Sequence, residues 1–306
     1  RPIFLFLTLL MTIALTVEII RGFIGSYIPY PNGIDIVVSK LSNSGNNLIG
    51  STFIGGSGND GINESGANLY TPTSSSGLCN FYADEYRGEI ILDSLSNCYV
   101  ASTTKSIDFP TVGASQINNG GMQDAIAFKL NSNLTNLLWS TYYGGNQNDA
   151  AYSIQLNNIN EIYITGGSES SNLNTSTNSA MPNFNGLVDG FLAKFDTLHN
   201  LSAATYIGNN GYNQSYFVQV DINNDVFVFG LTQSVMPVFP SGVYNNVGSQ
   251  FIQKFNSDLS SILISSSFGT GSISKTITPS AFLVSDCGLI YVCGWGGLNN
   301  IGTTSK

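Results

Sequence analysis

The chain has 306 residues, and only 9% of them are charged, against about 25% in an ordinary soluble domain. Asparagine, serine and glycine supply much of its polarity, while 42% of the residues are hydrophobic and 11% are aromatic. This composition excludes a disordered chain, which lacks apolar residues to bury, and a helical bundle, which is rich in Ala, Glu, Lys and Leu. It favours an all-β fold.

The net charge of the chain limits the kinds of molecule that it can bind. The formal net charge is −9 and no cluster of Lys or Arg occurs, so the chain would repel phosphate backbones and we expect no nucleic-acid partner. The single histidine, His199, excludes zinc sites built from several histidines. No motif for a cofactor stands out, and none is expected.

Residues 1–25 form a hydrophobic segment that differs from the rest of the chain. The run 3–20 contains one charged residue, Glu18, and follows Arg1. Its length is at the lower limit for a membrane-spanning helix, and the same pattern is typical of the core of a secretory signal. A signal, an anchor and the end of a fragment all stay open, and a membrane is expected as partner only if 3–20 is a true anchor.

Residues 26–306 contain four copies of one repeat, at about 33–121, 122–186, 187–247 and 248–306. Each copy has a lysine in a strand-like run, and a glycine follows 14 or 15 residues later. The lysines are Lys40, Lys129, Lys194 and Lys254, and the glycines are Gly55, Gly144, Gly208 and Gly269. A second strand-like run follows in each copy: NCYVAS at Asn97, EIYITG at Glu161, DVFVFG at Asp225 and LIYVCG at Leu289.

Each copy divides into four short β-runs separated by Asn, Ser and Gly turns of the kind that close hairpins. In the second copy the runs are about 125–130, 137–143, 151–156 and 161–165. The first run alternates, so that Ile126 and Leu130 point to one face and Lys129 to the other. Bulky apolar residues recur at the places of Ile126 and Leu130, and we expect the same face to be filled in every copy.

The spacing of the lysines favours propeller blades. It is 65 and 60 residues in the regular copies, whereas a solenoid repeat is about 20 to 30 residues long. The sequence therefore predicts an all-β protein, a β-propeller of four-stranded antiparallel blades that is present as a partial ring. The first spacing is 89 residues because 65–88 is inserted, and we expect this insertion to form a surface loop.

The segment FKLNSNLTNLLWSTYYGGNQNDAAYSIQLNNINEIYITGGS, from Phe128, resembles the SBBP repeat, a seven-bladed β-propeller repeat of bacterial surface and secreted proteins. DEYRGEIILDSLSNCYVASTTKSIDFP, from Asp84, and AFLVSDCGLIYVCGWGG, from Ala281, are similar to the propeller region of large Bacteroidetes proteins associated with gliding motility and type IX secretion. The resemblance covers about residues 32–300. It implies export to the cell surface or the extracellular space, and it brings no catalytic residues.

We therefore expect a non-catalytic scaffold for recognition or adhesion within a larger secreted protein, with a cell-surface glycan or protein as partner. The alternative is a propeller enzyme that acts on polysaccharide, with Asp84, Glu85 or Glu89 as acid or base. Such an enzyme needs two carboxyl groups about 5 to 9.5 Å apart across a cleft.

Three residues are candidates for binding. Asp60 and Asp149 follow glycine-rich turns at equivalent positions, and repeated acidic residues at a blade rim can bind cations or sugars. Capping of the turn is the commoner role for such an Asp. Trp295 is the best candidate for an exposed aromatic residue, because the other aromatic residues recur at strand positions that suit packing between blades.

A weak calcium candidate lies at Asp221, Asn223 and Asp225, which alternate as the ligands of a calcium loop do. Val226 stands where an EF-hand loop requires glycine, and the glutamate at the twelfth position is absent. A plain β-turn is favoured, and no metal is expected.

Overall fold

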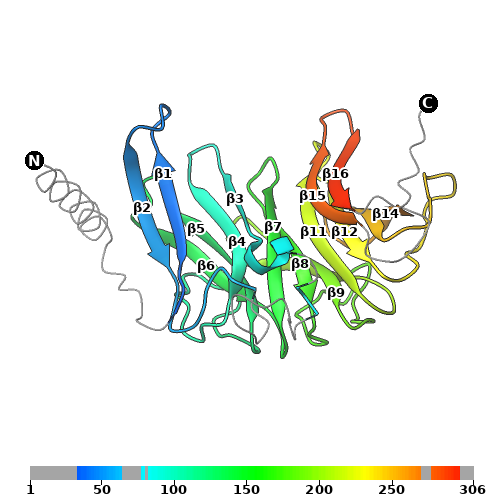
Figure 1. Ribbon diagram of the computed structural model, residues 1–306, viewed down its shortest axis with the longest axis horizontal. Coiled ribbons are helices and arrows are strands. Elements are labelled where there is room, and N and C mark those ends of the chain that lie inside the picture. The colour runs from blue at the N-terminus through cyan, green and yellow to red at the C-terminus, as the bar shows by residue number, and fades with distance from the viewer. Residues whose placement is uncertain (1–32, 64–76, 80–81, 270–276, 297–306) are drawn as a thin grey trace, which may run out of the picture.

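The computed structural model describes residues 33–63, 77–79, 82–269 and 277–296. These residues form antiparallel sheets that follow one another along the chain and fan out as the blades of an incomplete β-propeller (Figure 1). The hydrophobic segment 1–25 and the run 3–20 lie outside the described residues. Within the described ranges, no helix is both long and apolar enough to cross a membrane.

Three blades are complete four-stranded sheets with their strands hydrogen-bonded in chain order. The first blade contains β3 (Glu89–Leu92), β4 (Cys98–Thr104), β5 (Asp124–Leu130) and β6 (Leu137–Tyr143). The second contains β7 (Asp149–Leu156), β8 (Ile162–Ser168), β9 (Asp189–Phe195) and β10 (Leu201–Ile207). The third contains β11 (Asn213–Val220), β12 (Val226–Thr232), β13 (Gln250–Phe255) and β14 (Ile262–Phe268).

A two-stranded sheet stands at each end of the arc. The N-terminal hairpin is β1 (Ile36–Leu41) with β2 (Leu48–Ile54), and the C-terminal hairpin is β15 (Ile277–Val284) with β16 (Ile290–Gly296). Strands β3, β7, β11 and β15 pack successively against one another and are therefore the inner strands of the arc. The hairpin β1–β2 thus corresponds to the outer half of a blade, and β15–β16 to the inner half. The expected all-β partial ring is confirmed.

The sequence repeat and the sheet are offset by two strands. In the second repeat, β5 and β6 are the outer strands of the first blade, whereas β7 and β8 are the inner strands of the second blade. Each repeat therefore spans the boundary between two neighbouring blades, and the glycine turn between β6 and β7 is the point where the chain crosses it.

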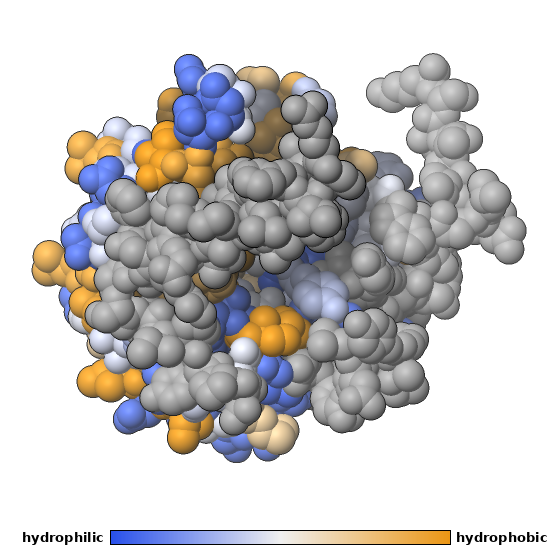
Figure 2. Space-filling view, turned by 60° about the vertical axis from the view of Figure 1, so that its left-hand side comes forward, coloured by the Kyte–Doolittle hydropathy of each residue, from blue (hydrophilic) through white to orange (hydrophobic). Residues whose placement is uncertain are grey.

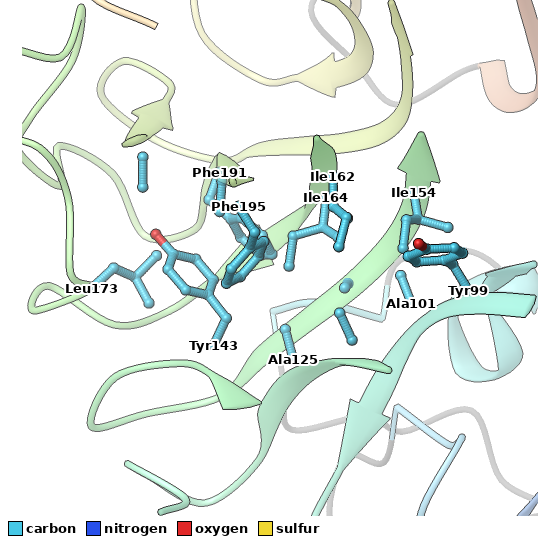
Figure 3. Packing of buried hydrophobic residues seen from close by; sticks show 14 of the residues in the cluster. Tyr99, Ala101, Ala125, Tyr143, Ile154, Ile162, Ile164, Leu173, Phe191 and Phe195 are labelled. Carbon is cyan, nitrogen blue, oxygen red and sulfur yellow. The ribbon is translucent and has the colours of Figure 1, made fainter. Parts of the chain in front are cut away.

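Large aromatic residues fill the space between neighbouring blades (Figure 3). Phe191 and Phe195 of β9 face the preceding blade, where they meet Tyr143 and Trp139 of β6. The ring centroids lie 5.1 Å apart for Tyr143 and Phe191 and 5.3 Å apart for Trp139 and Phe195. All four side chains are buried, as expected for strand aromatics that pack between blades.

The faces at the two ends of the arc remain uncovered by any described residue. Ile126, Phe191 and Phe251 occupy one repeat position and are 0% exposed, whereas Val37, at the same position in β1, is 56% exposed. At the other end Tyr291 of β16 is 55% exposed, and the equivalent Tyr163 is 0% exposed. Figure 2, which brings the β1–β2 end forward, shows hydrophobic patches among hydrophilic ones on the described surface there.

This difference predicts unequal costs for truncation at one repeat position. We expect Ile126→Ala to lower the free energy of unfolding by about 2–5 kcal/mol, because it leaves a cavity between blades. Val37→Ala serves as the matched control and should change it by less than about 0.5 kcal/mol. Chemical denaturation of the two variants measures both values, and equal losses would contradict the arrangement of blades.

Candidate functional site

Each described turn between neighbouring blades closes on a pair of polar side chains, of which only Asp35 is half-buried and the others are buried. In each pair, the backbone N–H of the second residue donates a hydrogen bond to the carbonyl of the residue that precedes the first one. These bonds join Asp60 to Ile34, Asp149 to Gln123 and Asn213 to Val188, at 2.6, 2.7 and 2.7 Å. The three pairs therefore share one backbone geometry. We call them the seam pairs: Asp35 with Asp60, Asp124 with Asp149, and Asp189 with Asn213.

The second member of each seam pair anchors its turn to the end of the inner hairpin. Oδ2 of Asp149 accepts hydrogen bonds from the Gly145 N–H at 2.7 Å and from the Ser170 hydroxyl at 2.8 Å. The same bonds run to Asp60 from Gly56 and Ser106, at 2.8 and 2.9 Å. In each case the serine follows the second inner strand by two residues, so one side chain fixes both the turn and the hairpin.

The first member of each seam pair explains the glycine that follows the lysine in the first three repeats. A Cβ placed on Gly144 would lie 2.4 Å from Cγ of Asp124, and on Gly208 it would lie 2.2 Å from Oδ1 of Asp189. Gly55 has the same relation to Asp35. Any larger residue would displace the carboxyl group, so the glycine is required by close approach.

Burial perturbs the acidity of these groups. It raises the pKa of Asp124 to about 7, with a further rise from the nearby charge of Asp149. It raises the pKa of Asp149 to about 6 and that of Asp189 to about 6. The structure therefore corrects the expectation that Asp60 and Asp149 lie at an open blade rim. Both are buried turn anchors and present no oxygen to a ligand at the surface.

The repeat lysine binds the turn of its own blade's inner hairpin. Lys194 lies 2.8 Å from Glu161, and Lys129 lies 3.6 Å from Asp93. Each ammonium group also lies over an aromatic ring of the second inner strand, 5.5 Å from the ring centroid of Tyr163 in β8 and 4.7 Å from that of Tyr99 in β4. The lysine thus fastens the outer strands of each complete blade to the inner ones.

The calcium candidate is one of these lysine sites. The Lys254 ammonium group lies 3.1 Å from Asp221 and 2.7 Å from Asp225, so a cation already occupies the space between the two carboxylates. Oδ1 of Asp221 accepts the backbone N–H groups of Asn223 and Asp225, each at 2.9 Å, as a turn-forming Asp does. No group of three or more potential metal ligands occurs in the described parts of the chain. The favoured β-turn is what the structure contains.

Asp84 is buried in the short 3-10 helix η1 (Tyr82–Tyr86). Its Oδ2 accepts a hydrogen bond from the Tyr216 hydroxyl at 3.1 Å, and Nε of Arg87 lies 3.7 Å from its Oδ1. The Arg87 guanidinium group also covers the Tyr216 ring, 4.7 Å from its centroid. These contacts fix η1 against the inner strand β11 and leave Asp84 inaccessible to a polysaccharide.

Glu89 lies on the inner strand β3 and accepts hydrogen bonds from the inner strand β7 of the neighbouring blade. Its Oε2 accepts the Ile154 N–H of β7 at 2.8 Å and also the Ser153 hydroxyl. Burial raises the pKa of Glu89. Glu85 is part of η1 and is half-buried. Asp84 thus contacts β11 and Glu89 contacts β7, so each of these carboxyl groups has a partner on an inner strand.

The insertion 65–88, expected as a surface loop, is described at 77–79 and 82–88, where Leu78 and Asp84 are buried and Tyr86 is 50% exposed. Leu78 is buried, and its carbonyl accepts hydrogen bonds from the Tyr152 hydroxyl at 3.2 Å and from Nε2 of Gln214 at 3.0 Å. These partners belong to the inner strands β7 and β11. A loop that would be solvated on a regular blade therefore fills space on the inner side of the arc.

Trp295 lies in β16, where its backbone pairs with Thr278, and its side chain is outside the described part of the chain. The aromatic residues that sequence analysis assigned to packing are buried, and this prediction is confirmed. They are Trp139, Tyr142, Tyr143, Tyr206 and Tyr212. The lone histidine, His199, is half-buried and stacks on Trp139 with ring centroids 5.0 Å apart.

Sequence reasoning missed an exposed aliphatic residue in the turn of every described inner hairpin, at the middle of the turn for Leu95 and Ile159 and at its last residue for Leu289. These residues, which we call the tip aliphatics, are Leu95, Ile159, Ile222 and Leu289, with exposed fractions of 75, 57, 74 and 56%. The tips lie on one side of the arc, at the top in Figure 1. The available signal was an apolar residue inside each Asn, Asp or Ser turn, where strand alternation gives no reason for it.

Neither a scan against protein-family models nor a search of curated proteins found a match for this chain. Its class is defined by its architecture, which is an all-β, propeller-like arc of four-stranded antiparallel blades with buried polar pairs at the seams.

Removal of the Asp84 charge should affect stability and leave polysaccharide turnover unaffected. We expect Asp84→Asn to cost about 2 kcal/mol of unfolding free energy, because Arg87 loses its buried partner. Glu85→Gln, in the same helix, is the control and should cost less than about 0.5 kcal/mol. If Asp84→Asn folds with unchanged stability and abolishes hydrolysis of a glycan by the parent protein, the structural role is wrong.

Addition of calcium should leave the thermal unfolding midpoint of the protein unchanged, because the Lys254 ammonium group already pairs with both Asp221 and Asp225. Lys254→Met should lower the free energy of unfolding by about 1 kcal/mol, since it leaves two partly buried carboxylates without their cation. Thermal scans with calcium and with a chelator test both statements, and a midpoint raised by calcium in the parent protein would contradict them.

Proposed function

We propose that this chain is the propeller region of an exported, non-catalytic protein that recognises another protein at a cell surface. The observation that carries the proposal is the set of tip aliphatics, one on each described inner hairpin. Exposed apolar groups gathered on one side of a rigid fold are typical of an interaction site.

The tips are preorganised for contact. Oδ1 of Asp93 accepts the backbone N–H groups of Leu95 and Asn97, at 3.0 and 2.8 Å. Oδ1 of Asn157 likewise accepts those of Ile159 and Glu161, at 3.2 and 2.9 Å. Because each turn is locked by its own side chain, a partner that binds Leu95 or Ile159 has little loop entropy to remove.

The chemistry of the tips favours a protein over a glycan. Stacking on a sugar ring requires an accessible aromatic face, and the large aromatic residues of the complete blades are mostly used in packing between blades. Aliphatic side chains surrounded by polar turns, whose carboxylates are paired with the repeat lysines in the complete blades, instead suit the apolar core and polar rim of a protein interface.

The resemblance to SBBP repeats and to the propeller region of Bacteroidetes proteins associated with gliding motility and type IX secretion supports export and a surface or extracellular location. The low content of charged residues and the abundance of Asn and Ser agree with a repetitive extracellular scaffold. Asp84 and Glu89 have structural partners, and this supports the non-catalytic assignment.

Binding of the labelled chain to intact bacterial cells tests the proposal. We expect saturable binding that is lost when the cells are treated with protease and kept when their glycans are oxidised. The double variant Leu95→Asp, Ile159→Asp should raise the half-saturating concentration at least about tenfold, the effect of losing one to two interface hot spots. Leu198→Asp, at an exposed outer-hairpin turn, is the matched control.

Two results would contradict the proposal. Equal binding by the tip variant and the control would exclude the tip aliphatics as the recognition surface. Binding that survives protease and disappears on glycan oxidation, or release of sugars from a glycan panel by the parent chain, would assign the protein to glycan recognition or to catalysis.

A further inference from the structure

We propose that Asp124 and Asp149 hold one proton between their Oδ1 atoms, so that this seam pair is a buried acid pair and its ligand is a proton. The inference concerns the seam between the first and second blades and is independent of the recognition surface.

The hydrogen bonds of the two carboxyl groups leave one oxygen of each without a partner. Oδ2 of Asp124 accepts the Gly120 N–H at 2.8 Å and Nε2 of Gln116 at 3.0 Å, and Oδ2 of Asp149 accepts Gly145 and Ser170. Both Oδ1 atoms are buried and have no hydrogen-bond partner. A buried carboxylate oxygen without a partner is costly, and a proton or a cation held between two such oxygens removes that cost.

The third seam pair decides between these two ligands. There Asn213 takes the place of Asp149 on the same backbone geometry, and Asp189 takes the place of Asp124. Nδ2 of Asn213 donates hydrogen bonds to Oδ1 of Asp189 at 3.3 Å and to the Asn209 carbonyl at 2.6 Å. The amide therefore puts hydrogen where a cation would have to lie. A protonated Asp149 has the same shape and the same donor.

The charged surroundings also favour a proton. Glu169, beyond the end of β8, is the other charged group that bears on Asp149, and it is negative. The remaining titratable groups that face the pair are the phenols of Tyr142 and Tyr143 on β6 and of Tyr206 on β10. Two ionised carboxylates enclosed with a third nearby would repel one another, and one proton removes that repulsion.

The stability of the fold should depend on pH, because the folded and unfolded chains bind different numbers of protons. The pKa of each carboxyl is 3.8 in the unfolded chain and is raised in the folded one, to about 7 for Asp124. The folded state therefore binds more protons, and stability falls as pH rises from about 4 to about 7 and then levels off. The seam is thus tightest in mildly acidic surroundings.

Two opposite substitutions test the proposal in the full chain, with thermal unfolding measured from pH 5 to pH 8. Asp149→Asn copies the natural Asn213 arrangement, and we expect it to raise the midpoint at pH 8 and to flatten its dependence on pH. Asn213→Asp creates a second acid pair with Asp189, and it should lower the midpoint at pH 8 more than at pH 5. Infrared spectra should show a protonated carboxyl band at pH 6 that is weaker in Asp149→Asn than in the parent protein, the remainder coming from Asp189.

The cation alternative gives different results. It would be supported, and the proposal overturned, if calcium or magnesium raised the midpoint of the parent protein at pH 8 and Asp149→Asn removed that rise. The proposal would also fail if Asp149→Asn and Asn213→Asp both folded and left the pH dependence unchanged. The pair Asp35 and Asp60 is present in every variant, so its contribution cancels.

Discussion

Burial of a carboxyl or amide side chain against a glycine at each seam is the contact on which the arrangement of blades depends. Asp149 holds the turn through Gly145 and the inner hairpin through Ser170, while Asp124 rests directly on Gly144. The polar groups of a buried turn need partners, and a single side chain supplies them. The aromatic packing between blades can form only because this crossing fixes the direction in which the next blade begins.

The offset between repeat and sheet gives the seam its importance. Since β5 and β6 belong to one blade and β7 and β8 to the next, the second repeat contains the crossing at Gly144 and the seam pair of Asp124 with Asp149. The lysine site acts within a blade, where Lys194 joins the outer strand β9 to the turn before β8. The seam pair acts between blades. Together they tie the outer strands both to their own inner strands and to the following blade.

Much of the fold follows from the sequence. The alternation of Ile126, Leu130 and Lys129 and the recurring glycine give the strands, their faces and the propeller architecture. The burial of Asp60 and Asp149 does not follow, because charged residues are expected at the surface and the compensating serine lies about 20 residues beyond Asp149 and over 40 beyond Asp60. The burial of Leu78 in the insertion depends on inner strands more than 70 residues away in the chain, so no local sequence pattern predicts it.

The candidate sites, too, were predictable from the sequence only in part. The turn at Asp221 was predictable, because its spacing fits a turn better than a calcium loop, and the partner Lys254 lies in the next hairpin. The separation of Asp84 from Glu89 required the tertiary structure. The sequence shows the tip aliphatics as apolar residues within polar turns. Their exposure could not be predicted, because it depends on which turns face outward in the assembled arc.

Amide hydrogen exchange at the seams tests the central claim most directly. The N–H groups of Gly56, Gly120, Gly145 and Asn185 lie in loops, and each donates to a seam carboxylate at 2.6 to 2.8 Å. The account predicts that they exchange as slowly as the strand amides of β5 and β9, because opening them requires a seam to separate. Exchange as fast as in the exposed turn 42–47 would contradict it.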